Sequence, residues 1–277
     1  MKIIFRNFFN LLAIGAFDAK CTVETMSEFK WNKLLQMAEA NSVRDVICQG
    51  IATTGAKYVP EKVYETALNG CTSFQASQFK EIGNYNFAAS RQIKQFAMPY
   101  LNRRYNNLVF NEIHNIDTSI ESLILLKKLI ESINILICTG LDIRNLAYLG
   151  TYLRNYGDKI DFVKTENWIT LLNLRSMCNL TGCFMHILFA FEQEELPFAR
   201  NINTRRLSKA DKIIMKSLTY NQTRPLQQVE KNDTNIINPI HIKKQNIHPL
   251  KYFNFFPVET SGRFVSNIIK SLSNIDE

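Results

Sequence analysis

The stretch of residues 120–136 reads IESLILLKKLIESINIL. Its residues are strongly apolar, while Lys127 and Lys128 in its interior mark a side that faces solvent. Asp117 or Ser119 can cap its first turn. The stretch therefore predicts a long helix that is buried on most of its surface.

Amphipathic helices are expected on both sides of that stretch, because apolar residues recur at helical spacing on one face. These helices cover residues 1–12, 27–40, 43–51, 60–70, 141–156, 161–172, 176–191 and 264–272. Gly157 is suited to a left-handed cap of the helix before it. Residues 73–106 can form one or two helices, broken near Gly83 and Pro99. We expect an all-α fold, a bundle-like array of helices with a less ordered, basic C-terminal arm.

Positive charge is concentrated near the C-terminus. Residues 200–277 carry 13 basic and six acidic residues, which accounts for +7 of the formal net charge of +8. Residues 221–248 mix Asn, Gln, Lys and Pro with scattered Ile, which is typical of a linker or a loosely packed arm. We therefore divide the chain into a helical domain, residues 1–199, and a basic arm, residues 200–277, that can end in a helix.

Three features favour a soluble, cytoplasmic protein. Arg6, Asn7 and Asn10 interrupt the apolar run that a secretory signal needs. No segment offers the roughly 20 apolar residues of a membrane span. The cysteines form no C-x-x-C pair, so we expect reduced thiols rather than disulfides or a zinc site. They are Cys21, Cys48, Cys71, Cys138, Cys178 and Cys183.

The segment Gly157–Asp161, GDKID, looks at first like the acidic motif of a nucleotidyl transferase. Two metal-binding carboxylates on a strand need one residue between them, so that both point to the same face. Asp158 and Asp161 are three residues apart and flank a turn between helices. We favour an N-cap role for one of them.

The histidines suggest no metal site. They are His114, His186, His241 and His248, and they form no i, i+4 pair and no H-E-x-x-H motif. We interpret His186 as hydrogen-bonded in the core or at its boundary and the others as exposed. The motifs G-x-x-x-x-G-K-[ST], G-x-G-x-x-G and G-x-S-x-G are absent from the sequence. We expect no cofactor or metal and assign no catalytic residue, while a composite site of distant residues stays open.

Two kinds of charged cluster each have a functional and a plain interpretation. Glu192, Glu194 and Glu195 form either a binding site for a cation or a basic partner, or the solvated end of a helix. We favour the solvated helix end. The cationic clusters form either a site that contacts phosphates while neighbouring aromatic side chains stack on the ligand, or solvated basic surface. We favour the solvated surface. These cationic clusters are Arg103 and Arg104 with Tyr105, and Arg205, Arg206, Lys209 and Lys212.

Two stretches carry a resemblance to a known family. The first comprises residues 8–12 with Gly15, Met26, Trp31, Ala38, Gly50 and Ile51, and the second residues 140–144 and 157–161 with Leu149, Leu153 and Trp168. They resemble the helical N-terminal part, and the helical region after the catalytic core, of a poorly characterised family of bacterial proteins described as nucleotidyltransferases. Together they cover about half of the chain.

The interval between the two stretches limits what the resemblance implies. The family places there a mixed sheet with a lysine–glycine strand end and a closely spaced Asp pair that holds a divalent metal. Residues 50–140 contain no equivalent. The resemblance therefore implies a shortened relative that kept the helical flanks and lost the transferase core, and no catalytic residue is carried over.

Three functions follow, in this order. The first is a non-enzymatic helical interaction or accessory protein that binds a protein partner, with its basic arm ordering on contact. The second is a divergent, metal-dependent nucleotidyltransferase using Asp142, Asp158 and Asp161. The third is nucleic-acid binding through the arm. Whether the chain is an enzyme stays open, and we favour a protein without enzymatic activity.

Overall fold

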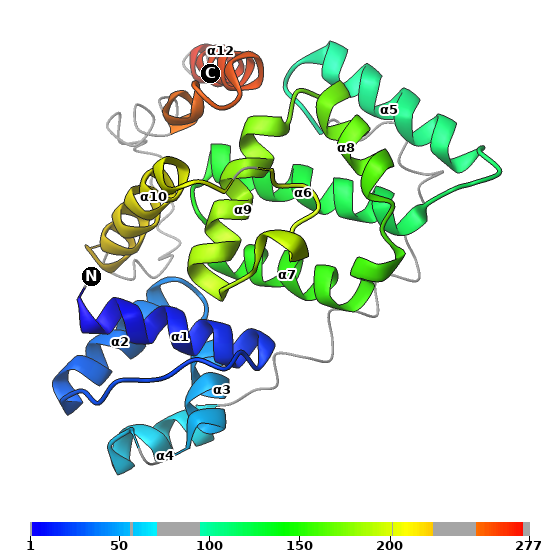
Figure 1. Ribbon diagram of the computed structural model, residues 1–277. Helices are drawn as coiled ribbons and strands as arrows, with labels where there is room; N and C mark the ends of the chain where they lie inside the picture. Colours follow the sequence, from blue (N-terminus) through cyan, green and yellow to red (C-terminus); the bar gives the residue numbers. More distant parts are fainter. Residues whose placement is uncertain (1, 56–57, 71–94, 201, 224–247, 274–277) are drawn as a thin grey trace.

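The computed structural model describes residues 2–55, 58–70, 95–200, 202–223 and 248–273, and it is all-α, as predicted (Figure 1). No strand occurs within these ranges. The helices are α1 (Ile3–Phe17), α2 (Glu28–Ala40), α3 (Arg44–Thr54), α4 (Glu61–Gly70), α5 (Pro99–Ile113), α6 (Ile120–Cys138), α7 (Ile143–Tyr156), η3 (Gly157–Lys159), α8 (Phe162–Leu171), α9 (Arg175–Phe189), η4 (Gln193–Glu195), α10 (Thr204–Thr223), η5 (His248–Tyr252) and α12 (Pro257–Ser273).

Helices α1 and α3 pack so closely that their backbones meet. A Cβ atom added to Gly15 would lie 1.9 Å from the carbonyl oxygen of Val46, and one added to Gly50 would lie 2.3 Å from that of Leu11. Ordinary contact for such atoms begins near 3.4 Å. The two glycines therefore set the distance between the first and third helices.

An extended segment between α1 and α2 is held against α1 by side chains. Asn7 is fully buried, accepts the backbone N–H of Glu24 at 2.9 Å and donates to its carbonyl at 2.7 Å. Arg6 adds a two-pronged ion pair with the Glu24 carboxylate. This contact replaces the backbone partners that the extended segment lacks.

Helix α6 is long and buried along most of its length, as predicted. It packs against α7, α8, α9 and η5. Ser119 stands at its N-cap, one of the two predicted positions, but makes no side-chain cap bond. Its backbone N–H donates instead to the buried Glu112 at 2.8 Å, and Glu112 also pairs with Lys164 at 2.9 Å. Figure 1 shows α6 behind α9.

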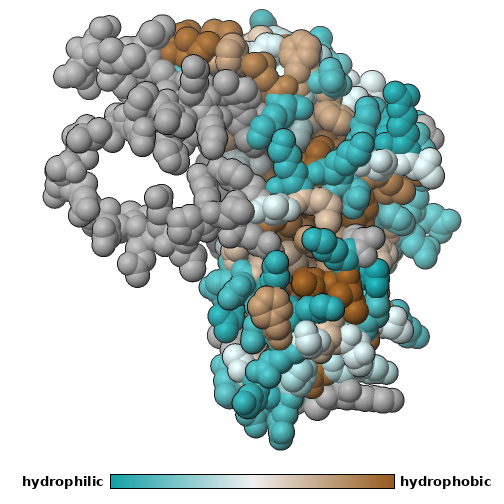
Figure 2. Space-filling model, turned by 90° about the vertical axis from the view of Figure 1, so that its left-hand side faces the viewer, coloured by the Kyte–Doolittle hydropathy of each residue, from teal (hydrophilic) through white to brown (hydrophobic). Residues whose placement is uncertain are grey.

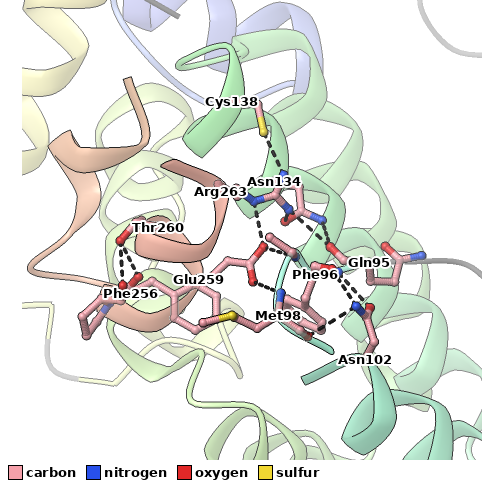
Figure 3. A network of polar contacts seen from close by, with 12 residues as sticks. Gln95, Phe96, Met98, Asn102, Asn134, Cys138, Phe256, Glu259, Thr260 and Arg263 are labelled. Atoms are coloured by element: carbon pink, nitrogen blue, oxygen red, sulfur yellow. Dashed lines mark hydrogen bonds and ion pairs between the residues drawn. The ribbon is translucent and has the colours of Figure 1, made fainter. Parts of the chain in front are cut away.

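Helix α12 buries its polar side. The Glu259 carboxylate, which has no exposed surface, accepts the backbone N–H groups of Ala97 and Met98 at 2.7 and 3.3 Å and pairs with Arg263 at 2.7 Å (Figure 3). Arg263 in turn donates to Asn134 on α6 at 2.7 Å. The helix is thus attached to the start of α5 and to α6 through charge.

The apolar side of α12 faces outward. Val265 and Ile269 are 52 and 61% exposed. Apolar side chains gather at the top of the face drawn in Figure 2, where α12 lies in Figure 1. The helix expected over residues 264–272 is therefore present and begins earlier, but its apolar face is not its packing face.

The predicted left-handed cap at Gly157 is wrong. Its φ of −54° is right-handed, and the chain continues from α7 into the short helix η3. The first helix is also longer than predicted, reaching Phe17 rather than residue 12. Of residues 73–106, the structure describes only those from Gln95 onward, where α5 begins at Pro99.

Candidate functional site

Four cations form a row on the outer face of α10. Arg205, Lys209, Lys212 and Lys216 follow one another at spacings of four, three and four residues, which places them on one side of a helix with 3.6 residues per turn. All four are exposed. None makes an ion pair or hydrogen bond with any residue that the structure describes. We call these four residues the basic row.

The opposite face of α10 fixes the row in place. Ala210, Ile214 and Leu218 have no exposed surface. The helix packs against α9 and α2, and Figure 1 shows it at the edge of the molecule. With a rise of about 1.5 Å per residue, the row extends over about 16 Å. The basic row is therefore straight and points to solvent.

Further cations lie at the start of α10. Arg206 follows the first residue of the row and donates to the carbonyl of Arg200 at 3.1 Å. Arg200 is exposed and lies 3.3 Å from Glu166. The first turn of α10 contains no acidic residue, although the N-terminus of a helix carries partial positive charge. The charge at this end of the row is thus not neutralised within the helix.

The row is electrostatically unfavourable in the free protein. Two like charges about 6 Å apart in water repel by about 0.7 kcal/mol, and less as salt is added. Acidic groups placed along the row turn that repulsion into attraction. The arrangement can therefore bind an extended anion.

The aspartates considered for metal binding occupy different positions. Asp161 caps α8 by accepting the backbone N–H of Lys164 at 2.9 Å, which confirms the predicted cap role. Asp142 caps α7 by accepting that of Asn145 at 3.0 Å. Asp158 is exposed in η3. Among the described residues, no three His, Cys, Asp or Glu side chains gather as metal ligands.

The histidines and cysteines are placed as follows. His186 on α9 is hydrogen-bonded through Nδ1 to the carbonyl of Phe191 at 2.8 Å, as predicted, but it is exposed, so its predicted place in or at the edge of the core is wrong. His114 is exposed as predicted. The cysteines that the structure describes are free. Burial raises the pKa of the Cys178 thiol to about 12. His241, Cys71 and the side chain of His248 lie outside the described residues.

The other charged clusters have structural roles. Glu192 and Glu195 form a reciprocal capping box around η4, and Glu195 lies 3.4 Å from Arg154. Arg103 and Arg104 are exposed, but Tyr105 beside them is 3% exposed and packs against Phe96. Tyr105 is therefore not available for stacking on a base.

Two features were missed in the sequence. Lys216 was not grouped with the other members of the basic row, although its spacing of 11 residues from Arg205 is a helical period. The buried pair of Glu259 and Arg263 shows the i, i+4 spacing of an ordinary surface pair. Only burial distinguishes it, so no signal in the sequence could have found it.

Comparison with protein-family models found no match, and comparisons with curated proteins and with solved structures found none either. The resemblance to nucleotidyltransferases therefore stays a prediction. None of the described helices has the length and apolar content that crossing a membrane requires.

Proposed function

We propose that the chain is a non-enzymatic interaction protein that binds an acidic partner protein through the basic row of α10. The observation that carries this proposal is the alignment of four exposed cations over a fully buried face of the same helix. The buried face holds the helix backbone in place, so binding orders mainly the exposed side chains of the row and of the partner.

The spacing of the row suits an acidic segment of a protein. Neighbouring cations are about 4.5–6 Å apart along the helix axis. Alternate residues of an extended peptide are about 6.6 Å apart and point the same way, so an alternating acidic strand matches the row. Single-stranded nucleic acid is usually bound with aromatic side chains that stack on bases, and residues 205–216, which carry the row, include no aromatic residue.

The test compares two polyanions of equal charge. Fluorescence anisotropy measures the binding of a labelled peptide of alternating Glu and Ala and of a single-stranded oligonucleotide. In the double variant Lys209→Gln/Lys212→Gln, we expect peptide affinity at low salt to fall about tenfold, since exposed ion pairs contribute about 0.2–1 kcal/mol each. Lys62→Gln/Lys159→Gln, which removes two exposed lysines on α4 and η3, serves as the matched control.

Each outcome decides between functions. The proposal is contradicted if the two double variants lose peptide affinity equally, or if the wild-type protein does not bind the peptide at all. Tighter binding of the oligonucleotide, with a steep salt dependence that becomes shallower in the row variant, favours nucleic-acid binding instead. A magnesium-dependent rise in unfolding temperature with nucleoside triphosphates favours the divergent transferase.

We also infer a cytoplasmic location. Cys48, Cys178 and Cys183 are buried and free, and Cys21 and Cys138 are free as well. Reduced thiols of this kind are usual in a reducing compartment. Labelling of free thiols in cells, before and after lysis, measures whether they are reduced there.

A further inference from the structure

A hollow lies on the flank of α10, beside the basic row. Residues of α1, α9 and α10 line this hollow, which has a volume of about 380 Å³ and is largely open to solvent. It is lined by Phe9, His186, Ile187, Leu207, Ser208 and Asp211. The hollow combines apolar walls with a few polar groups, as small-molecule sites do, and would leave part of a bound ligand in contact with solvent.

The imidazole of His186 presents an acceptor. Its Nδ1 lies 2.8 Å from the carbonyl oxygen of Phe191. A carbonyl only accepts hydrogen bonds, so Nδ1 carries the proton and donates it. In the neutral ring, Nε2 is then unprotonated and accepts a hydrogen bond. The chain thus fixes the tautomer of an exposed histidine at the hollow.

Two further acceptors line the same hollow. Ser208 and Asp211 are three residues apart on α10 and therefore lie on one side of the helix. Neither side chain makes a hydrogen bond or ion pair with any residue in the described ranges. Asp211 is half-buried, so its carboxylate is partly withdrawn from water without a cationic partner. Such a carboxylate favours a cation beside it.

We propose that the hollow binds a small organic amine with an apolar body. A primary ammonium group has three N–H donors, and the hollow supplies three acceptors: Asp211, the Ser208 hydroxyl and Nε2 of His186. Phe9, Ile187 and Leu207 provide apolar surface for the rest of the ligand. The site is distinct from the basic row, because it takes a cation where the row takes an anion.

The test uses phenethylamine and its neutral counterpart, phenylethyl alcohol. Heteronuclear NMR of the full chain follows the amide signals of Ser208 and Asp211 and the ring signals of His186 during each titration. We expect saturable shifts with the amine. In Asp211→Asn the affinity for the amine falls roughly ten- to hundredfold, because a hydrogen bond to a charged group contributes about 1.5–3 kcal/mol.

Two controls keep the result specific. Asp158→Asn removes an exposed carboxylate from η3 and leaves amine binding unchanged. Ser208→Ala weakens it with little effect on folding, since that hydroxyl has no described partner to lose. The proposal is overturned if phenethylamine shifts none of these signals up to its solubility limit. Equal affinity for phenylethyl alcohol, or an equal loss in Asp158→Asn, also overturns it.

Discussion

Replacing Gly15 by alanine should destabilise the protein by forcing α1 and α3 apart. The new Cβ would lie 1.9 Å from the carbonyl oxygen of Val46 and 2.8 Å from the backbone nitrogen of Gly50. Normal contact near 3.4 Å requires a movement of about 1.5 Å at the oxygen. Both neighbours are backbone atoms of α3, which cannot rotate away as a side chain does.

The expected loss in free energy of unfolding is the cost of overpacking minus the gain in helix propensity. Overpacking of a core costs about 1–3 kcal/mol, and a clash with rigid backbone belongs at the upper end of that range. Alanine is favoured over glycine within a helix by about 1 kcal/mol. The net loss is therefore about 2 kcal/mol, a large share of the roughly 5–15 kcal/mol that stabilises a typical domain.

Urea unfolding measures this loss as a lower midpoint at an unchanged slope. Gly157→Ala is the matched control, since Gly157 is helical and an added Cβ there meets nothing within 4 Å. It should stabilise the protein by up to about 1 kcal/mol. The double variant Gly15→Ala/Gly50→Ala should cost less than the sum of its single variants, because one displacement of the helices accommodates both methyl groups. A midpoint for Gly15→Ala at or above the wild-type value would refute the reasoning.

Two other predictions concern local interactions. Asp161→Ala should lower the free energy of unfolding by about 1 kcal/mol through loss of the α8 cap; Asp158→Ala should leave it unchanged, and equal losses in urea unfolding would argue against the cap. Thiol labelling of the native protein followed by mass spectrometry should modify the exposed Cys138 and spare Cys178, whose burial raises its pKa from 9.0 to about 12. Because of that raised pKa, Cys178 contributes stability below about pH 9, and this contribution is lost as the pH rises from 9 towards 12 because the thiol of the unfolded chain ionises first. The unfolding midpoint of the wild type should therefore fall more over this interval than that of Cys178→Ala. An equal or smaller fall would contradict the prediction.

Local rules predicted much of this fold. The apolar run of residues 120–136 predicted α6, and an N-cap role was predicted for one of Asp158 and Asp161, which Asp161 has. Both depend only on nearby residues. The error at Gly157 has a local cause as well, because glycine permits a left-handed cap without requiring one.

Tertiary contacts decided what local patterns could not. Helical periodicity places Ile268 and Ile269 on the apolar face of α12, yet both are exposed. The polar side of the helix packs inward instead, where Glu259 accepts the N–H groups of Ala97 and Met98. Basic residues of α10 were recognised as a cluster, but no helix was predicted over residues 204–223, so their alignment on one face was missed. The hollow combines residues about 180 positions apart in the chain, such as Phe9 and His186, so no spacing in the sequence indicates it.

The attachment of α12 also constrains when the protein can finish folding. The acceptor Glu259 lies 162 residues after Ala97, the residue whose N–H it receives. At about 5–20 residues per second, a ribosome needs roughly 8–32 s to synthesise that interval. Until then the N–H groups at the start of α5 must be hydrated, and Asn134 lacks its guanidinium partner. The first half of the nascent chain therefore reaches its final packing only after α12 has been synthesised.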